Sequence, residues 1–401
     1  MSKVIVVGAG PAGIMAAIKA SEENEVILIE RNDEIGKKLK LTGGGRCNIT
    51  NNREIEDMLE KVVTNKKFLY SSFYTFTNRD VLKYFSERGL EYKVEYDEKI
   101  YPQNDTSEDI INIFKRDLKE HNIKVLYNST VTDFIIEEET IKGVIINDSK
   151  EVYADKVIVS TGGKSFPQTG SDGLTFSLLE KYNHSVTPLY AALIPLVVKE
   201  NFVKNMQGIS MKDVSIKAKV KNKTFMQQGD MIFTHFGISG PGVLKISSYI
   251  TKVLEKNDVV LTLDFLSSMT KEELSKKIRE NVNKTIFNNI KGILPQKFLK
   301  EILELCNLED VKAADLKKQD ELKFINLIKE MNLTIGETLT IKAAMVTSGG
   351  VSVKEINSST LESKKIKNLY FCGEVIDIDA ETGGYNLQIA FSTGTLAGML
   401  T

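Results

Sequence analysis

The chain has 401 residues, of which 42% are hydrophobic and 27% are charged, and its formal net charge is -1. A chain of this length can form two or three domains with a sizeable core, and the composition is that of an ordinary globular protein. The balanced charge argues against a nucleic-acid partner and an anionic membrane surface, and no apolar run approaches the roughly 18 residues of a membrane span.

The start of the chain and its cysteines indicate a reducing compartment. The first residues enter a strand-like run without a basic segment or a cleavage site, so we expect no signal peptide. Cys47, Cys306 and Cys372 are widely spaced and form neither a disulfide framework nor a CxxC metal pair. Three histidines far apart in sequence argue against a His-rich metal site. We therefore expect a cytoplasmic monomer or homodimer without a metal site.

The first thirty residues predict a dinucleotide-binding turn. The β-branched run at 4–7 predicts a buried parallel strand, and Gly8, Gly10 and Gly13 follow with the spacing of a turn that opens a helix. The first glycine permits the bend, the second admits a pyrophosphate and the third allows close helix packing. Glu30 ends the next strand, where a carboxylate accepts hydrogen bonds from an adenosine ribose. The alternative is a fortuitous glycine turn in an unrelated α/β unit.

A glycine-rich loop occupies residues 36–51. Its consecutive glycines at 43–45 disfavour a helix or strand, because glycine loses much conformational freedom in either. We interpret the segment as a loop along an extended cofactor, with Lys37 or Lys38 and Arg46 near phosphate or flavin. The alternative is a flexible surface loop, which would more often be rich in serine and poorer in apolar residues.

Residues 53–154 are predicted to be scaffold. Helices are expected near 79–88 and 106–120, because apolar residues recur on one face of each. Four short strands are expected to form a β-meander, at 123–126, 131–137, 141–147 and 151–154.

Another predicted buried strand, at 156–159, runs into Thr161, Gly162 and Gly163. In a doubly wound sheet the carboxyl end of such a strand lies at the edge where ligands bind. The alternative is a simple strand exit, followed by Asp172 as the N-cap of the next helix. For Asp172 we favour the N-cap, because that is a common role of aspartate before a helix.

The pattern changes near residues 188–195 and predicts an inserted domain. Alternating segments from 196 to 266 suggest antiparallel strands of a small barrel or sandwich, and residues 270–331 are helical and rich in charge. We predict a Rossmann-like cofactor domain at 1–192 and 342–401 with an insert at 193–341. The insert divides into a barrel-like part at 193–268 and a helical part at 269–335.

His235 is a candidate catalytic residue within the insert. It lies in a glycine-rich segment with aromatic neighbours, and a general acid or base needs a group that titrates near neutrality. In the alternative interpretation Ser239 and Gly240 start a helix with Pro241 at its first position, and His235 is a hydrogen-bonded structural residue. We favour the structural interpretation, because a lone histidine is weak evidence for an active site.

The C-terminal segment predicts a second ligand-facing edge. A last buried strand at 367–374 ends in Gly373 and Glu374, and Gly383 and Gly384 then precede a helix that runs to about residue 399. The N-terminus of that helix is a positive dipole end, which suits negative charge on a bound cofactor. The alternative is a Gly-Gly turn before a C-terminal helix.

Four segments together resemble a known family. They are GKKLKLTGGGRCNITNN, STGGKSFPQTGSDGLTFSLLEKYNH, FTHFGISGPGVL and LYFCGEVIDIDAETGGYNLQIAFSTGTLAG. From Val4 to Gly398 the chain is similar to the bacterial flavoproteins called HI0933-like, aminoacetone-oxidase-type or bile-acid-reductase-type. The resemblance implies an α/β fold: a Rossmann-type FAD-binding domain of the two-dinucleotide-fold flavoprotein type with a β-meander, interrupted by an insert that covers the flavin.

The resemblance also implies which residues bind FAD. Related flavoproteins commonly carry Gly-Asp where this chain has Gly373 and Glu374, so either Glu374 or Asp377 is expected to contact the ribityl chain. Cys47 and Cys372 are expected to be small apolar residues near the cofactor, since no CxxxxC redox pair is present. The expected FAD-binding residues are Gly8, Gly10, Pro11, Ala12, Gly13, Glu30, Arg31, Lys38, Gly44, Gly45, Arg46, Cys47, Asn48, Val131, Thr161, Gly162, Gly163, Gly373, Glu374, Asp377, Gly383, Gly384, Tyr385, Asn386 and Leu387.

We therefore predict an FAD-dependent oxidoreductase that transfers hydride between a small organic substrate and flavin N5. It would use NAD(P)H to reduce an activated double bond, or it would oxidise an amine with oxygen as acceptor. The sequence holds no second GxGxxG, so NAD(P)H would visit the flavin transiently. The alternative is a flavin-containing RNA-modification or regulatory protein without redox turnover, against which the dispersal of lysines among acids counts.

Overall fold

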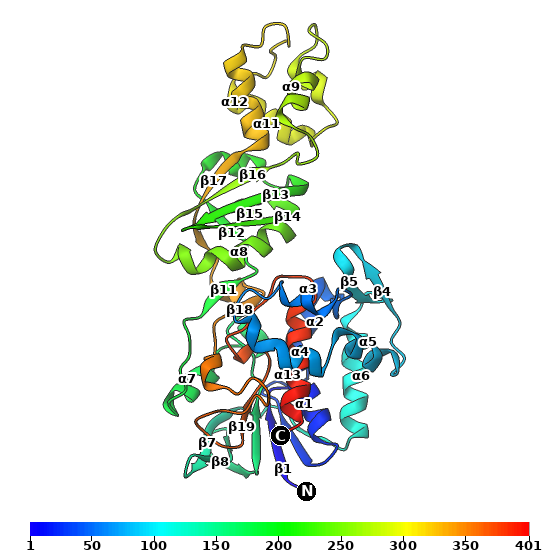
Figure 1. Cartoon of the computed structure of the whole chain (residues 1–401), viewed down its shortest axis with the longest axis vertical. Coiled ribbons are helices and arrows are strands. Elements are labelled where there is room, and N and C mark those ends of the chain that lie inside the picture. Colours follow the sequence, from blue (N-terminus) through cyan, green and yellow to red (C-terminus); the bar gives the residue numbers. More distant parts are fainter. Residues whose placement is uncertain (401) are drawn as a thin grey trace. The chain divides into compact units, whose positions relative to one another are not determined.

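The computed structural model describes residues 1–400, which form two compact units (Figure 1). Unit 1 comprises Met1–Tyr190 together with the chain from Met345 onward, and unit 2 comprises Ala191–Ala344. We had placed the insert at 193–341, so each observed boundary lies within three residues of the predicted one.

Unit 1 is built on a five-stranded parallel sheet in the order β19-β10-β1-β2-β6. The central strand has no exposed face, because Val4, Ile5 and Val6 are all 0% exposed. Strands buried on both faces are expected to be continuous apolar runs, as residues 4–7 of the central strand are. Their bounds are β1 (Lys3–Val7), β2 (Glu25–Ile29), β6 (Lys124–Leu126), β10 (Lys156–Val159) and β19 (Leu369–Phe371).

Helix α1 (Pro11–Ala20) follows β1 and packs against α13 (Tyr385–Gly398), the red helix of Figure 1. The two backbones are very close, since a Cβ on Gly394 would lie 2.3 Å from the carbonyl oxygen of Ala12. The first and the last helix of the chain therefore pack side by side. The remaining helices of unit 1 are α2 (Lys37–Leu41), α3 (Ile55–Leu59), α4 (Tyr70–Thr75), α5 (Asn78–Ser86), α6 (Ser107–Glu120) and α7 (Leu174–Lys181).

Two small antiparallel sheets complete unit 1. The meander has three strands, not the four we expected, because the run at 123–126 pairs in parallel with β2 and belongs to the central sheet. That run is short and only partly buried, so its apolar pattern could not distinguish the two sheets. The sheets are β3 (Thr50–Asn51), β5 (Lys99–Pro102) and β4 (Tyr92–Glu95), and β7 (Val131–Glu137), β8 (Thr140–Ile146) and β9 (Lys150–Tyr153). Two further strands are β11 (Tyr190–Ala192) and β18 (Val346–Ser348).

Unit 2 contains a closed six-stranded barrel in the order β12-β15-β14-β13-β16-β17. The barrel closes with β17, which follows the helices, whereas we had assigned residues 331–335 to the helical part. The strand that closes a barrel can come from far along the chain. Here the helix α12 ends only two residues before β17 begins, so the sequence pattern did not reveal the change from helix to strand. The strands are β12 (Leu196–Val198), β13 (Ser210–Val220), β14 (Lys223–Phe233), β15 (Gly237–Ser239), β16 (Val259–Asp264) and β17 (Met331–Thr338).

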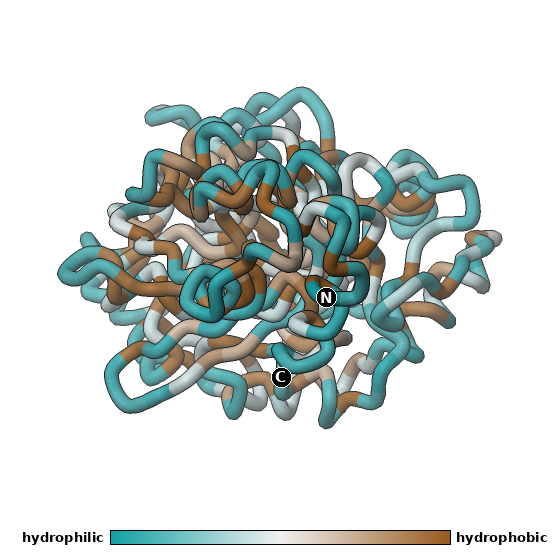
Figure 2. Tube along the Cα trace, turned by 90° about the horizontal axis from the view of Figure 1, so that it is seen from above, coloured by the Kyte–Doolittle hydropathy of each residue, from teal (hydrophilic) through white to brown (hydrophobic). Residues whose placement is uncertain are grey.

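The helices of unit 2 share the core of the barrel. Phe298 and Phe324 are 0% exposed in that core. Hydrophobic stretches along the chain are short and alternate with hydrophilic turns (Figure 2), and no helix among residues 1–400 is long and apolar enough to cross a membrane. The helices are α8 (Pro241–Leu254), α9 (Lys271–Ile278), α10 (Ile286–Ile290), α11 (Gln296–Cys306) and α12 (Lys318–Lys329).

Candidate cofactor site

A cleft with a volume of about 240 Å³ lies within unit 1 at the carboxyl ends of the parallel strands. Residues that directly follow β1, β2, β10 and β19 line it, together with the start of α13. Open α/β sheets bind ligands at this edge. We predict ligand-binding residues at the carboxyl ends of these strands, and the structure brings those strand ends together at one edge of the sheet.

The three glycines of the first turn have three different surroundings. A Cβ on Gly8 would lie 2.7 Å from the carbonyl oxygen of Ser160, and one on Gly13 would lie 1.9 Å from the carbonyl oxygen of Gly8. A Cβ on Gly10 would meet nothing within 4 Å, and Gly10 lines the cleft. Gly8 and Gly13 are thus required by packing against the sheet, whereas Gly10 leaves space for a ligand.

The N-terminus of α1 is prepared for an anion. Gly10 is its N-cap and provides no side chain, Pro11 occupies the first turn, and no acidic residue lies in that turn. Unpaired backbone N–H groups and the helix dipole at such a site favour a phosphate group.

Glu30 is held at one end of the cleft with one oxygen partly free. The residue is 7% exposed, and its Oε2 accepts a hydrogen bond from the backbone N–H of Ala9 at 2.8 Å. Its Oε1 accepts from the backbone N–H and the side-chain amide of Asn32 at 2.8 and 2.7 Å. A carboxylate has about four acceptor positions, so a ribose hydroxyl can still donate to Oε2.

A second set of contacts closes the cleft beside Glu30. Arg31 forms an ion pair with Asp172, and Asn32 donates from Nδ2 to the carbonyl oxygen of Thr169 at 3.0 Å. The cap position of α7 is Gly173, with a φ of 81°, and not Asp172 as we predict. Asp172 lies one position further out, where its Oδ1 still accepts from the backbone N–H of Leu174, the first residue of α7, at 3.1 Å, and its Oδ2 pairs with Arg31. We name these four residues, Arg31, Asn32, Thr169 and Asp172, the clasp.

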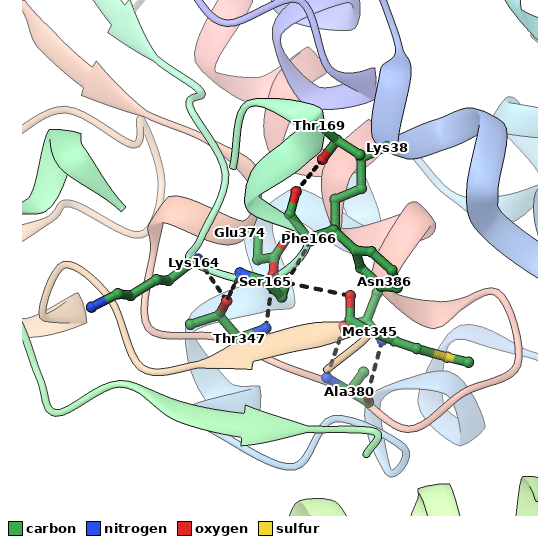
Figure 3. Close-up of polar contacts among 10 residues, drawn as sticks. All are labelled: Lys38, Lys164, Ser165, Phe166, Thr169, Met345, Thr347, Glu374, Ala380 and Asn386. Atoms are coloured by element: carbon green, nitrogen blue, oxygen red, sulfur yellow. Dashed lines mark hydrogen bonds and ion pairs between the residues drawn. The ribbon is translucent and has the colours of Figure 1, made fainter. Parts of the chain in front are cut away.

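The other end of the cleft is organised by a charged network (Figure 3). Lys38 Nζ lies 2.6 Å from Glu374 Oε2 and 2.7 Å from Ser165 Oγ. Glu374 Oε1 accepts from Ser165 Oγ at 3.0 Å and from the backbone N–H of Thr347 at 2.8 Å. Glu374 lines the cleft, whereas Asp377 does not and is hydrogen-bonded to Asn65. Of the two acids we left open, Glu374 is the one that reaches the cleft.

The N-terminus of α13 also meets the cleft through Asn386 and Leu387. Its cap, Gly384, has no side chain, and no acidic residue lies in its first turn. Asn386 fixes the preceding loop by exchanging hydrogen bonds with both backbone groups of Ala380, at 3.0 and 2.8 Å. Two unblocked helix N-termini, those of α1 and α13, therefore serve one cleft.

Two buried hydroxyl groups test whether a dinucleotide-type cofactor fits. Thr161 Oγ1 and Ser171 Oγ line the cleft and have no hydrogen-bond partner among residues 1–400. Buried hydroxyls are normally paired, so each is suited to a ligand group. Together with the open side of Gly10 and the remaining acceptor position of Glu30, they fit a phosphate- and ribose-bearing cofactor.

The structure separates the predicted FAD ligands into two groups. Those that line the cleft are Gly8, Gly10, Pro11, Ala12, Glu30, Arg31, Lys38, Val131, Thr161, Gly162, Gly163, Gly373, Glu374, Asn386 and Leu387. Those that do not line it are Gly13, Gly44, Gly45, Arg46, Cys47, Asn48, Asp377, Gly383, Gly384 and Tyr385.

The contacts of Arg46 explain why part of the glycine-rich loop does not line the cleft. Arg46 pairs with Glu95 and Asp105, and its guanidinium lies 4.1 Å from the ring centre of Tyr101. The glycine loop therefore turns its charge toward the small sheet of β4 and β5. Burial raises the pKa of the Cys47 thiol to about 12 and also raises that of Cys372, so neither supplies a ready thiolate.

Several lining residues were not predicted, among them Asn32, Ser129 and Met345. Asn32 lies two positions after Glu30, a spacing at which an asparagine can bond to a preceding carboxylate, and this local signal was present in the sequence. Ser129 and Met345 lie at the cleft because of the tertiary fold, and no pattern in the neighbouring sequence identifies them.

His235 lies in unit 2, between β14 and β15, with an exposed side chain. Its ring contacts Phe236 edge-on, with the ring centres 4.9 Å apart. Helix α8 begins at Pro241 with Gly240 as its cap, as the structural interpretation of this segment requires. The acid or base role of His235 stays a prediction.

Comparison with known proteins shows the family to which this chain is similar. Residues 2–400 match the HI0933-like protein Rossmann domain. A 3-dehydro-bile acid delta(4,6)-reductase of Clostridium scindens is 32% identical over 99% of this chain and 98% of its own length. A ribosomal RNA dihydrouridine synthase of Haemophilus influenzae is 30% identical over 98% and 96%. A solved 3-ketosteroid delta1-dehydrogenase of Sterolibacterium denitrificans shares the fold, with a TM-score of 0.55, 13% identity and 100% and 99% coverage.

Proposed function

Because this chain belongs to the HI0933-like Rossmann family of FAD-dependent oxidoreductases, we propose that its cleft binds FAD and that it reduces a carbon–carbon double bond conjugated to a carbonyl group. When bound, FAD supplies hydride transfer at its N5 atom. The net reaction adds a hydride and a proton across the double bond, and NAD(P)H is the proposed source of the electron pair.

The observation that carries this proposal is the convergence of two unblocked helix N-termini and two ordered carboxylates on one cleft. The start of α1 would hold the pyrophosphate, and Glu30 the adenosine ribose. Glu374 would accept from ribityl hydroxyls, and the start of α13 would favour negative charge on the flavin ring. Lys38 neutralises Glu374, so its carboxylate does not oppose that charge.

Two relatives support reduction over amine oxidation. One is named for reducing a delta(4,6) double-bond system of a 3-dehydro bile acid, and the other for forming dihydrouridine. A 3-oxo steroid diene and the uracil ring share a carbon–carbon double bond conjugated to a carbonyl group. Such a bond accepts hydride at the carbon that lies farther from the carbonyl group. Both relatives align over nearly the whole chain, whereas no relative compared above is an amine oxidase.

We propose a small unsaturated ketone as substrate, and a uracil base in RNA as the second candidate because of the Haemophilus relative. We also propose a cytoplasmic monomer or homodimer with no membrane partner. The three cysteines support a reducing compartment, since all are free thiols in the structure.

The test is an anaerobic absorbance experiment on the FAD-loaded protein. NADH and NADPH are tested first as reductants of the flavin. A 3-oxo-4,6-diene steroid or a uridine-containing ribosomal RNA is then added, and reoxidation of the flavin and formation of the saturated product are measured. Bleaching by NAD(P)H and recolouring by one of these acceptors supports the proposal. Bleaching by aminoacetone alone, with peroxide released in air, would replace it with the oxidase.

His235 is the one candidate proton-transfer residue, set against the structural role that we favour for it, and its test is separate. His235→Asn should slow turnover by more than roughly tenfold while leaving FAD retention unchanged. His121→Asn is the matched control, since His121 lies in unit 1 beside Ser21. A near-normal rate for His235→Asn would leave the residue with a structural role only.

A further inference from the structure

The charges of the two units are opposite. Residues 191–344 contain 24 Lys and Arg against 18 Asp and Glu, a net charge of +6, which leaves the other residues at -7 for a chain total of -1. The whole-chain balance, from which we had argued against a nucleic-acid partner, therefore conceals a basic unit and an acidic unit.

The excess positive charge of unit 2 is concentrated on the hairpin of β13 and β14. Five exposed lysines lie on this hairpin, and no ammonium group among them has an ion-pair or hydrogen-bond partner in the part of the chain that the structure describes. Elsewhere in unit 2 lysines commonly have such partners, as Lys199 has in Asp258 and Lys271 in Glu330. The five residues, which we name the lysine hairpin, are Lys212, Lys217, Lys219, Lys221 and Lys223.

The arrangement of the strand keeps these charges outward. Ile216 and Ala218 are buried in the barrel, so Lys217 and Lys219 alternate with them and share the outer face, about 7 Å apart along the strand. Met226 lies opposite Lys217 in the pairing of β13 with β14, and Thr224 lies opposite Lys219. The neighbours across the strand pair are therefore neutral.

Acidic residues are absent from the outer half of the hairpin. From Val214 to Gly229 the sequence contains four lysines and no Asp or Glu. Asp213 and Asp230 lie together at the other end, where Asp230 Oδ1 accepts from the backbone N–H of Asp213 at 3.0 Å. Four like charges that are held close without compensation cost stability, and an extended anion would remove that cost.

The polar neighbours favour a nucleic acid over a lipid surface. A membrane-binding hairpin would present aromatic side chains outward, but Phe225 instead stacks on Tyr249 with the ring centres 4.7 Å apart. Thr224, Gln228 and Asn222 are exposed on the hairpin and can hydrogen-bond to phosphate oxygens, and Met226, 63% exposed, is the one large apolar side chain exposed between Ser210 and Phe233. The same chemistry serves RNA and DNA, because both present a phosphodiester backbone.

We propose that the lysine hairpin is a docking surface for the phosphodiester backbone of a nucleic acid. This proposal does not rest on the reaction assigned to the cleft, because binding through phosphates requires no redox step. It predicts electrostatic, salt-dependent binding with little sequence preference.

The experiment measures fluorescence anisotropy of a labelled 30-nucleotide RNA and of a DNA with the same sequence, titrated with FAD-loaded full-length protein at 50–200 mM KCl. The test variant replaces Lys217, Lys219, Lys221 and Lys223 with glutamine. The control variant replaces four other exposed lysines of unit 2 with glutamine, so that the charge change is equal: Lys276, Lys291, Lys312 and Lys318.

The test variant should bind RNA at least about tenfold more weakly than wild type, and its slope of log Kd against log salt should be lower by about 3. The Kd of the control variant should change less than about threefold. Equal affinity for RNA and DNA would assign binding to phosphates, and tighter RNA binding would add 2′-hydroxyl contacts. Equal weakening by both variants, no RNA binding at 50 mM KCl, or binding only to anionic phosphatidylserine vesicles would overturn the proposal. Unchanged FAD retention and circular dichroism show that each variant is folded.

Discussion

Lys38 Nζ and Glu374 Oε2 lie 2.6 Å apart although 336 positions separate the two residues in the chain. The pair joins α2, in the N-terminal segment of unit 1, to the loop after β19, in its C-terminal segment. Both side chains are about one quarter exposed or less, so water screens the pair only in part. The contact therefore fixes the cleft at the point where the two segments of unit 1 meet.

Removing Lys38 should weaken cofactor binding. Lys38→Met leaves the Glu374 carboxylate without its cation, and we expect FAD affinity to fall at least about tenfold and the free energy of unfolding to fall by about 1–2 kcal/mol. FAD fluorescence titration and urea denaturation measure the two effects. The double variant Lys38→Met/Glu374→Gln should recover part of both losses, because it removes the unpaired charge. Simply additive losses would show that the ion pair has no coupling role.

The glycines of the first turn provide a matched pair of substitutions. Gly10→Ala should leave folding intact but lower FAD affinity at least about tenfold, because its Cβ meets no protein atom within 4 Å and points into ligand space. Gly13→Ala should destabilise unit 1 itself, because its Cβ would lie 1.9 Å from the carbonyl oxygen of Gly8. Thermal denaturation of the apo-protein separates the two results. A destabilised apo Gly10→Ala protein would contradict the assignment of Gly10 to ligand approach.

These glycines also show why the turn could be predicted from the sequence. Each of their roles depends on neighbours within one strand, turn and helix, and Glu30 follows at the spacing of the next strand. The family resemblance then supplied the fold and the division into a cofactor domain and an insert. Local pattern and resemblance therefore predicted the glycine turn and Glu30, but not Asn32, Thr169 and Asp172 of the clasp beside them.

The pairing of charged side chains could not be predicted in the same way. Arg31 and Asp172 are 141 positions apart, and no local pattern joins them. Arg46 was expected near the cofactor, but the fold brings Glu95 and Asp105 within reach of its guanidinium. An arginine pairs with whichever acids the tertiary structure places beside it, and many acids along this chain were available. The unequal charge of the two units, in contrast, could have been found from the sequence, because the predicted insert at 193–341 already contains the excess of lysines.

The clasp should control how fast FAD leaves. Its ion pair between Arg31 and Asp172 closes the cleft beside Glu30, so Asp172→Asn should increase the FAD dissociation rate several-fold, with a smaller effect on the association rate. Stopped-flow recovery of flavin fluorescence measures the dissociation rate. Asp133→Asn is the control, since Asp133 is also a partly exposed acid paired with a lysine, Lys181. Equal dissociation rates for wild type and Asp172→Asn would exclude a closing role for the ion pair.

His184 should make the stability of unit 1 depend on pH. Its side chain is 2% exposed, and burial lowers the pKa of the imidazole to about 4 from an ordinary value of 6.5. As pH falls, the unfolded chain takes up this proton before the folded chain does. The stability contribution of neutral His184 is therefore complete above about pH 6.5 and is lost progressively down to about pH 4, a loss on the order of 2–3 kcal/mol.

Urea denaturation between pH 7.5 and 4.5 measures this effect as a difference between variants, because carboxylates titrate in the same range. His184→Gln can keep the hydrogen bond that His184 Nε2 makes with Ser363 Oγ at 2.8 Å, and it should lose less stability than wild type on acidification. His121→Gln is the control, because it also removes an imidazole, but one that is only partly buried beside Ser21. If His184→Gln and wild type lose stability in parallel, the imidazole is protonated equally in both states, and burial does not hold His184 neutral.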